Sequence, residues 1–249
     1  MRSGNFNGKE SKCPEECFAR FRYTVAITWR DAKKATVMKA LGCIISYEEL
    51  CDREGNKKCI AYILANAGDQ GVGRPETSSL YRCSGTGRRT GRNFSILCKS
   101  DGHLMLLACE MELNPEMIPR IAAIDQPKVK QHIFSCCYSW QDSEPELNLI
   151  ESKCHGYKTV TTRSANNEYE NTSAHGFTTA WTWKKRNDTT FSGAPVLNRR
   201  AEYIGMICRR NEKHDSTVVA SLETLYSFLG ERERRQGKVY WRHGTHRPS

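Results

Sequence analysis

The chain has 249 residues, of which 38% are hydrophobic and 27% are charged, a composition that is ordinary for a soluble globular protein with a real core. No apolar run approaches the roughly 18 residues that a membrane-spanning helix needs, so a helical membrane protein is excluded and no membrane partner is expected. The formal net charge of +10 favours an acidic partner, either nucleic acid or an acidic protein.

The first 17 residues are polar and predict a disordered segment or an arm. They contain no apolar stretch of the kind that a signal peptide needs. From residue 18 onward the chain contains short runs of β-forming residues with turn signals between them. Predicted strands of the first half cover residues 21–29, 36–45, 58–65, 95–98 and 103–109, and a loop rich in glycine and arginine covers residues 84–92.

A proline-containing connector over residues 110–130 separates this half from a second set of predicted strands. The last predicted element is a helix over residues 221–229, where four apolar residues recur at helical spacing and Gly230 suits the C-terminus. The pattern as a whole predicts an all-β fold that can hold two barrels. The predicted strands of the second half cover residues 131–134, 157–162, 178–183, 195–197 and 203–208.

The sequence around Ser192 carries the most specific motif of the chain. Residues 190–197 read T-F-S-G-A-P-V-L, and an apolar-Gly-apolar run follows at residues 203–207. This pattern resembles the nucleophile loop of the trypsin family, in which a tight turn presents a serine hydroxyl and backbone N–H groups form the oxyanion hole. Five more segments resemble other parts of that family in the same order, namely residues 39–46, 63–69, 103–107, 137–140 and 218–229.

The resemblance extends over residues 18–230 and implies a trypsin-like fold. That fold consists of two antiparallel six-stranded β-barrels packed together, with a C-terminal α-helix. Because the family's catalytic sites lie in the cleft between the barrels, the corresponding residues should converge there. The expected parts are a polar N-terminal arm (1–17), the first barrel (18–114), the second barrel (128–220), the helix (221–229) and a basic tail (231–249).

At the catalytic positions, the resemblance implies a nucleophile without the residues that would activate it. Ser192 occupies the nucleophile position, Gly68 stands where the family has histidine, and His103 stands where it has aspartate. Glycine has no side chain that could take the serine proton, and the histidine occupies the orienting position behind the missing base. We therefore expect a pseudoprotease: a serine protease homologue that catalyses nothing, needs no cofactor, and acts as a protein-binding or adaptor module.

Three neighbouring positions extend this interpretation. The resemblance assigns Thr190 and Ser192 to the oxyanion hole, with Thr190 in place of a glycine. Phe191 replaces the aspartate that pairs with the new N-terminus after activation cleavage, and phenylalanine cannot form that ion pair. Arg186 falls at the base of the specificity pocket, where a cation would suit an acidic ligand.

Two other functions remain open at this stage. Because Ser192 and Gly193 are retained, the chain could be an active serine endopeptidase or hydrolase that uses a rearranged base. The positive net charge and the basic tail are compatible with an adaptor that binds nucleic acid or chromatin. A serine-directed probe tests the first alternative, and the salt dependence of binding tests the second.

The twelve cysteines do not occupy the disulfide positions of the family. They predict buried thiols in a reducing compartment, so an intracellular protein is expected, with secretion as the alternative. A replacement bridge between Cys43 and Cys59, on neighbouring predicted strands, also remains open. Cys13 and Cys17 have a zinc-like spacing without a second ligand pair at finger spacing, so no metal is expected.

Overall fold

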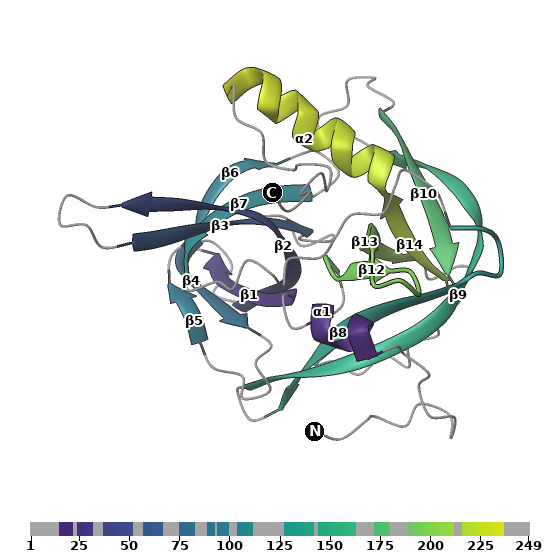
Figure 1. Ribbon diagram of the computed structural model, residues 1–249, viewed down its shortest axis with the longest axis horizontal. Coiled ribbons are helices and arrows are strands. Elements are labelled where there is room, and N and C mark those ends of the chain that lie inside the picture. The colour runs from purple at the N-terminus through teal and green to yellow at the C-terminus, as the bar shows by residue number, and fades with distance from the viewer. Residues whose placement is uncertain are drawn as a thin grey trace, which may run out of the picture.

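The structure is a computed structural model of the chain, in which two β-rich units lie side by side and a long helix crosses one end of them (Figure 1). The residues that it describes are 15–21, 24–31, 37–51, 57–66, 75–82, 89–92, 94–99, 104–111, 127–141, 144–162, 172–179, 189–190, 192–211 and 216–236.

The first unit is an antiparallel sheet of seven strands in the order β5-β4-β1-β2-β3-β7-β6. Its longest hairpin, formed by β2 and β3, reaches away from the second unit (Figure 1). The strands are β1 (Thr24–Asp31), β2 (Val37–Cys51), β3 (Lys57–Asn66), β4 (Pro75–Arg82), β5 (Arg89–Arg92), β6 (Ser95–Lys99) and β7 (Leu104–Glu110).

The second unit contains a closed barrel. Its sheet has the order β11-β8-β12-β13-β14-β10-β9, and the additional pairing of β8 with β9 joins six of the seven strands into a ring, with β11 attached to β8. The strands are β8 (His132–Gln141), β9 (Glu144–Thr162), β10 (Thr172–Thr179), β11 (Thr189–Thr190), β12 (Pro195–Leu197), β13 (Tyr203–Asn211) and β14 (Ser216–Ser221).

Strand β2 contributes side chains to two hydrophobic cores, one on each face of the first sheet. Successive side chains of a strand point to opposite faces of its sheet. Ala40 and Ile44 accordingly lie in a cluster made by the first sheet alone, whereas Leu41 and Cys43 lie in a cluster shared with the second unit. Because both faces of the strand are covered, the whole run from residue 40 to residue 45 is apolar and buried.

Two helices cover parts of the second unit. Helix α1 (Glu15–Phe21) lies against β8 and buries Cys17 and Phe21 completely. Helix α2 (Leu222–Gln236) packs on β10, β13 and β14 through its apolar stripe. None of the helices in the described part of the chain is long and apolar enough to cross a membrane.

The all-β class, the two-unit organisation and the C-terminal helix are confirmed. Two boundaries differ from the prediction. The predicted arm already turns helical at Glu15, because Cys17 and Phe21 find apolar partners in the shared core. The last helix continues through Gly230 to Gln236, because the Glu- and Arg-rich run that follows Gly230 consists of good helix formers.

Two features of the first sheet were not predicted. Residues 89–92 of the expected arginine-rich loop form strand β5, and residues 83–88 lie outside the described residues. Strand β4 was not predicted because it begins with proline and contains many polar residues. It lies between β1 and β5 towards one side of the sheet.

Two other predicted segments are only partly described. The predicted strand over residues 178–183 is described only as far as Thr179, at the end of β10. Residues 112–126 of the connector lie outside the described part.

The ten cysteines that the structure describes are all free thiols, and six of them are buried. The suggested bridge between Cys43 and Cys59 is wrong because of the register of the β2–β3 hairpin. Cys43 lies opposite Leu64, and Cys59 lies opposite Glu49, so the two cysteines are separated along the hairpin.

Thiol reactivity should follow this burial. We expect Cys51, which is exposed, to react with iodoacetamide in the native protein, and Cys43 and Cys137 to react only after denaturation. Burial raises the pKa of both Cys43 and Cys137 from the ordinary 9.0 to about 12, and the reactive thiolate is therefore scarce in the folded state. Pulse labelling followed by peptide mass spectrometry measures this difference. Equal labelling of Cys43 and Cys51 in the folded protein would contradict the packing.

Candidate functional site

The serine loop lies between β11 and β12 and is held by backbone hydrogen bonds from both units. The Leu41 N–H of β2 donates to the Ser192 carbonyl over 2.8 Å. The Gly193 N–H donates to the Ile207 carbonyl over 2.8 Å, and the Ile207 N–H donates to the Ala194 carbonyl over 2.9 Å. The loop therefore joins β2 of the first sheet to β13 of the barrel through backbone hydrogen bonds.

Gly193 is a point of close approach between the two units. Its φ of +88° lies in the left-handed region, which suits glycine. A Cβ atom at this position would lie 1.9 Å from the Leu41 carbonyl oxygen and 2.9 Å from the Asn66 backbone nitrogen. This glycine therefore allows the serine loop to lie directly against the backbone of β2 and β3.

The Ser192 hydroxyl faces two oxygen atoms. Its Oγ lies 3.0 Å from Asn66 Oδ1 and 2.9 Å from the carbonyl oxygen of Cys208. A serine hydroxyl has one hydrogen to donate, and both neighbours accept it. Neither an amide oxygen nor a peptide carbonyl can remove that proton at neutral pH, so the described surroundings engage the hydroxyl without activating it.

Asn66, at the C-terminal end of β3, is a site residue that sequence reasoning missed. It is only 1% exposed, and its side chain crosses from the first sheet to the serine loop. The sequence did contain one sign of this role, because the polar residue Asn66 directly follows the apolar run A-Y-I-L-A of a predicted strand. A buried amide needs hydrogen-bond partners. The partner found here, Ser192, is far away in sequence, so the pairing could not be predicted.

The segments beside the predicted triad positions meet near Ser192. Asn66 pairs with Leu104, the first residue of β7, so the ends of β3 and β7 that precede Gly68 and follow His103 lie together. Gly68 and His103 themselves lie outside the described residues, so their assignments stay predictions. Within the described part of the chain, the hydrogen bonds of the Ser192 hydroxyl go to oxygen atoms and not to a histidine nitrogen.

The other predicted site residues are only partly described. Thr190 lies on β11, where it pairs with Tyr138 of β8, and nothing is described of its side chain. Arg186 and Phe191 lie outside the described residues, so the pocket and activation assignments also stay predictions. In the described portion of the chain, His, Cys, Asp and Glu side chains form no group of three or more that could hold a metal ion.

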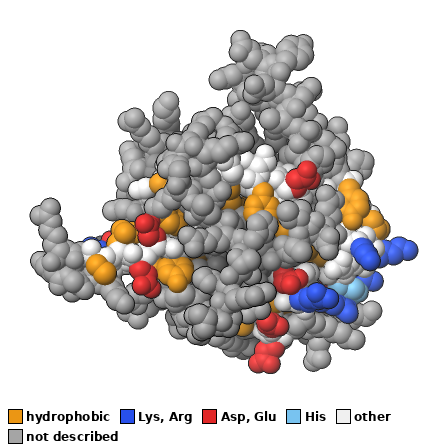
Figure 2. All heavy atoms as spheres, turned by 45° about the horizontal axis from the view of Figure 1, so that its top comes forward, with side chains coloured by type: hydrophobic (Ala, Val, Ile, Leu, Met, Phe, Trp, Pro, Cys, Tyr) orange, Lys and Arg blue, Asp and Glu red, His pale blue; other side chains and the backbone are white. Residues whose placement is uncertain are grey.

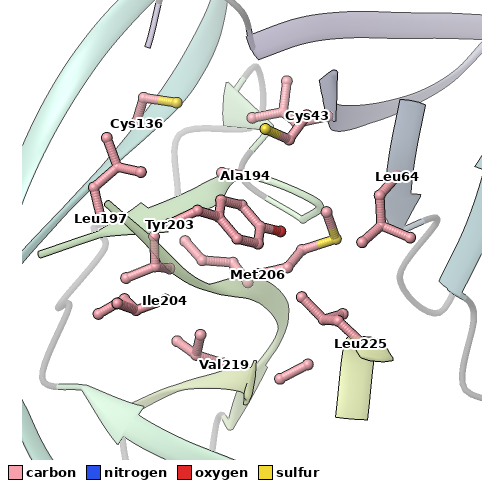
Figure 3. Close-up of a cluster of buried hydrophobic side chains, with 14 of the residues drawn as sticks. Cys43, Leu64, Cys136, Ala194, Leu197, Tyr203, Ile204, Met206, Val219 and Leu225 are labelled. Atoms are coloured by element: carbon pink, nitrogen blue, oxygen red, sulfur yellow. The ribbon is translucent and has the colours of Figure 1, made fainter. Parts of the chain in front are cut away.

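The core below the serine loop is apolar. Figure 3 shows Tyr203 and Met206 of β13 close to Ala194 of the loop, with Cys43 and Leu64 on the side of the first sheet. Desolvation raises the pKa of the fully buried Tyr203 phenol well above 10.0, so the phenol stays neutral. This tyrosine stabilises the shared core and is not poised for proton transfer.

The hairpin turn after β12 is organised by Asn198. Its Oδ1 accepts hydrogen bonds from the N–H groups of Arg200 and Glu202, and its Nδ2 donates to Glu202 Oε2 over 2.7 Å. Ala201, at φ +56°, completes the turn. A side-chain amide thus defines the conformation of this turn.

Comparison with known proteins supports the fold. No protein-family model matches the sequence, and no curated protein is significantly similar to it. Among solved structures, the active form of the Rv3671c protease from M. tuberculosis has a TM-score of 0.65 at 11% identity. The superposition covers 92% of this chain and 88% of the Rv3671c chain. The serine endoprotease from Yersinia pestis has a TM-score of 0.58 at 15% identity and covers 90% of this chain and 68% of its own.

A third similar structure is the HtrA-type protease AlgW with a tripeptide. It has a TM-score of 0.62 at 10% identity and covers 90% of this chain and 64% of its own. At these identities the comparisons show a trypsin-like, serine-protease-like fold.

Proposed function

We propose that this chain is a non-catalytic member of the trypsin-like fold that works as a protein-binding module. The observation that carries the proposal is the environment of Ser192, whose hydroxyl donates towards Asn66 Oδ1 and the Cys208 carbonyl. A serine nucleophile needs a base that can take its proton, and these oxygens cannot. The hydroxyl instead links β3 of the first sheet to β13 of the barrel.

The identities of the two triad positions support the same proposal. By resemblance, the base position is Gly68 and the orienting position is His103, so the sequence lacks a histidine where one would contact Ser192. Loss of the base alone removes the main route to an activated serine, and the described neighbours of Ser192 supply no replacement.

A binding role is a natural use of this fold once catalysis is lost. The similar AlgW structure contains a tripeptide, so the fold can hold a peptide in that protein. In this chain the units are joined by hydrogen bonds and by one shared apolar core, which gives a stable scaffold for a protein-binding surface.

The experiment is labelling of the folded protein with a fluorophosphonate probe that reacts with activated serines. We expect no labelling above that of the Ser192→Ala variant, because no described group can deprotonate the hydroxyl. An active trypsin-like protease at the same concentration serves as the positive control. Intact-mass measurement of the adduct provides the readout.

A second variant distinguishes two reasons for absent labelling, namely a hydroxyl that is engaged by Asn66 and a hydroxyl that lacks a base. Asn66→Ala removes the side chain that contacts Ser192, and we expect labelling to stay absent because a base is still missing. Labelling of the wild-type protein that disappears in Ser192→Ala would overturn the proposal. It would show that the serine is activated by a residue outside the described part of the chain.

A further inference from the structure

A turn and a strand of the second unit are fastened together on its surface. The Lys130 N–H donates to the Cys154 carbonyl over 2.6 Å, and the Cys154 N–H donates to the Gln131 carbonyl over 2.9 Å. The Tyr157 hydroxyl donates to the Pro127 carbonyl over 2.8 Å. The turn at residues 127–131 is therefore fixed against the middle of β9, and the side chains of both segments share one surface.

Strand β9 carries exposed side chains on both sides of a buried cysteine. Cys154 is buried in the core, whereas Lys153, His155 and Tyr157 are exposed. On the adjacent turn, residues 128–130 are also exposed. The resulting surface, called here the β9 patch, consists of Lys128, Val129, Lys130, Lys153, His155 and Tyr157.

The β9 patch combines positive charge with exposed apolar groups. Val129 is 50% exposed and Tyr157 is 53% exposed, the two highest values among the large hydrophobic side chains in the described part of the chain. Three lysines accompany them, and the Glu151 carboxylate of the same strand contacts His132 Nδ1 over 2.5 Å. Figure 2 shows basic side chains and a histidine at the right, the side on which β9 lies in Figure 1, with hydrophobic side chains above them and acidic ones beside them.

The conformation of the turn is costly, and the fold nevertheless maintains it. Lys130 has a φ of +68°, in the left-handed region that a residue with a Cβ atom rarely adopts. A glycine would avoid that cost, but it would not supply a positive charge. The hydrogen bond from its N–H to the Cys154 carbonyl holds the backbone of Lys130 in this conformation, so the lysine stays next to the exposed residues of β9.

We propose that the β9 patch binds an acidic, apolar-containing segment of a partner protein. This inference names a ligand for the proposed binding module and therefore rests on that function. The lysines complement carboxylates, and Val129 and Tyr157 supply the apolar contacts that a peptide side chain can cover. Nucleic acid fits less well, because phosphates would use the lysines and leave Val129 without a matching contact.

The test is fluorescence anisotropy at low salt with a short glutamate-rich peptide that carries two leucines. Lys128→Gln combined with Lys153→Gln should weaken its binding about tenfold, since each exposed charge pair contributes up to roughly a fivefold effect. Arg199→Gln combined with Arg200→Gln is the matched control, because it removes two exposed charges from a different turn. Binding by this control should stay within about twofold of the wild type.

Two single variants test the turn itself. Lys130→Gly removes a charge and relaxes the left-handed backbone, so we expect weaker peptide binding together with an unchanged or higher Tm. A loss of binding without a loss of stability cannot arise from unfolding. Val129→Ser should also weaken binding of this peptide. With a second peptide in which serine replaces both leucines, Val129→Ser and the wild type should bind equally well.

Three outcomes would overturn the inference. These are an absence of saturable peptide binding, an equal loss in the Arg199 and Arg200 control, or tighter patch-dependent binding of a single-stranded oligonucleotide or of phosphatidylserine vesicles. Each rejects the acidic peptide as ligand. The fluorophosphonate result is independent of them, so failure of the patch and failure of the proposed function are distinguishable.

Discussion

Gly193→Ala is expected to destabilise the protein by about 3–5 kcal/mol, enough to unfold a marginally stable domain. Two costs combine at this position. The left-handed φ of +88° is unfavourable for alanine, and the new methyl group would lie 1.9 Å from the Leu41 carbonyl oxygen. Backbone atoms of β2 cannot move aside as a flexible side chain could, so the two units would have to separate. Urea denaturation followed by circular dichroism measures the loss.

Gly230→Ala provides the matched control for this substitution. Gly230 lies within α2, and a Cβ atom there would meet nothing within 4 Å. Alanine should therefore stabilise the protein by about 0.5–1 kcal/mol, because glycine is a poor helix former. If Gly193→Ala proved as stable as the wild type, the close approach of the serine loop to β2 would be wrong.

Tyr138→Ala is expected to be comparably severe, with a loss of about 3–5 kcal/mol. Tyr138 is completely buried on β8, and its hydroxyl donates to the Thr24 carbonyl of β1 over 3.1 Å. The substitution would leave a large cavity in the shared core and a buried carbonyl without this donor. Because the core is continuous between the units, we expect a single unfolding transition with a lower midpoint.

Two further variants separate the contributions of Tyr138. Tyr138→Phe keeps the ring and removes the hydroxyl, so a loss of about 1–2 kcal/mol is expected. Leu50→Ala is the exposed control, since Leu50 is 44% exposed, and it should cost less than about 1 kcal/mol. Two separate transitions in thermal denaturation of Tyr138→Ala would show that the units fold independently.

The serine loop has a structural role between the two units. Its carbonyl accepts from Leu41, its hydroxyl donates towards Asn66 and Cys208, and its glycine allows the close approach of β2. On the proposed function, these contacts explain why the S-G-A-P pattern remains when the base position does not. The loop holds the two units together, and stability alone is a reason to keep it.

The sequence by itself determined the class of fold and the order of its parts. Alternating and apolar runs indicate strands because side chains of a strand alternate between faces, and the spacing of Leu222, Leu225 and Leu229 indicates the final helix. Such periodicity is local, so it can be seen without knowing which strands pair. The serine motif likewise pointed to residue 192 and, through the resemblance, to a trypsin-like fold, which the structure confirms.

Only the tertiary structure decided what surrounds that serine. The contact between Ser192 and Asn66 joins residues 126 positions apart, and the fit of Gly193 against Leu41 depends on how two sheets pack. The register of the β2–β3 hairpin, which separates Cys43 from Cys59, was equally inaccessible because bulges shift the pairing. Hydrophobic patterns report which face of a strand is buried, but the groups that meet across a packed interface are set by the geometry of the whole fold.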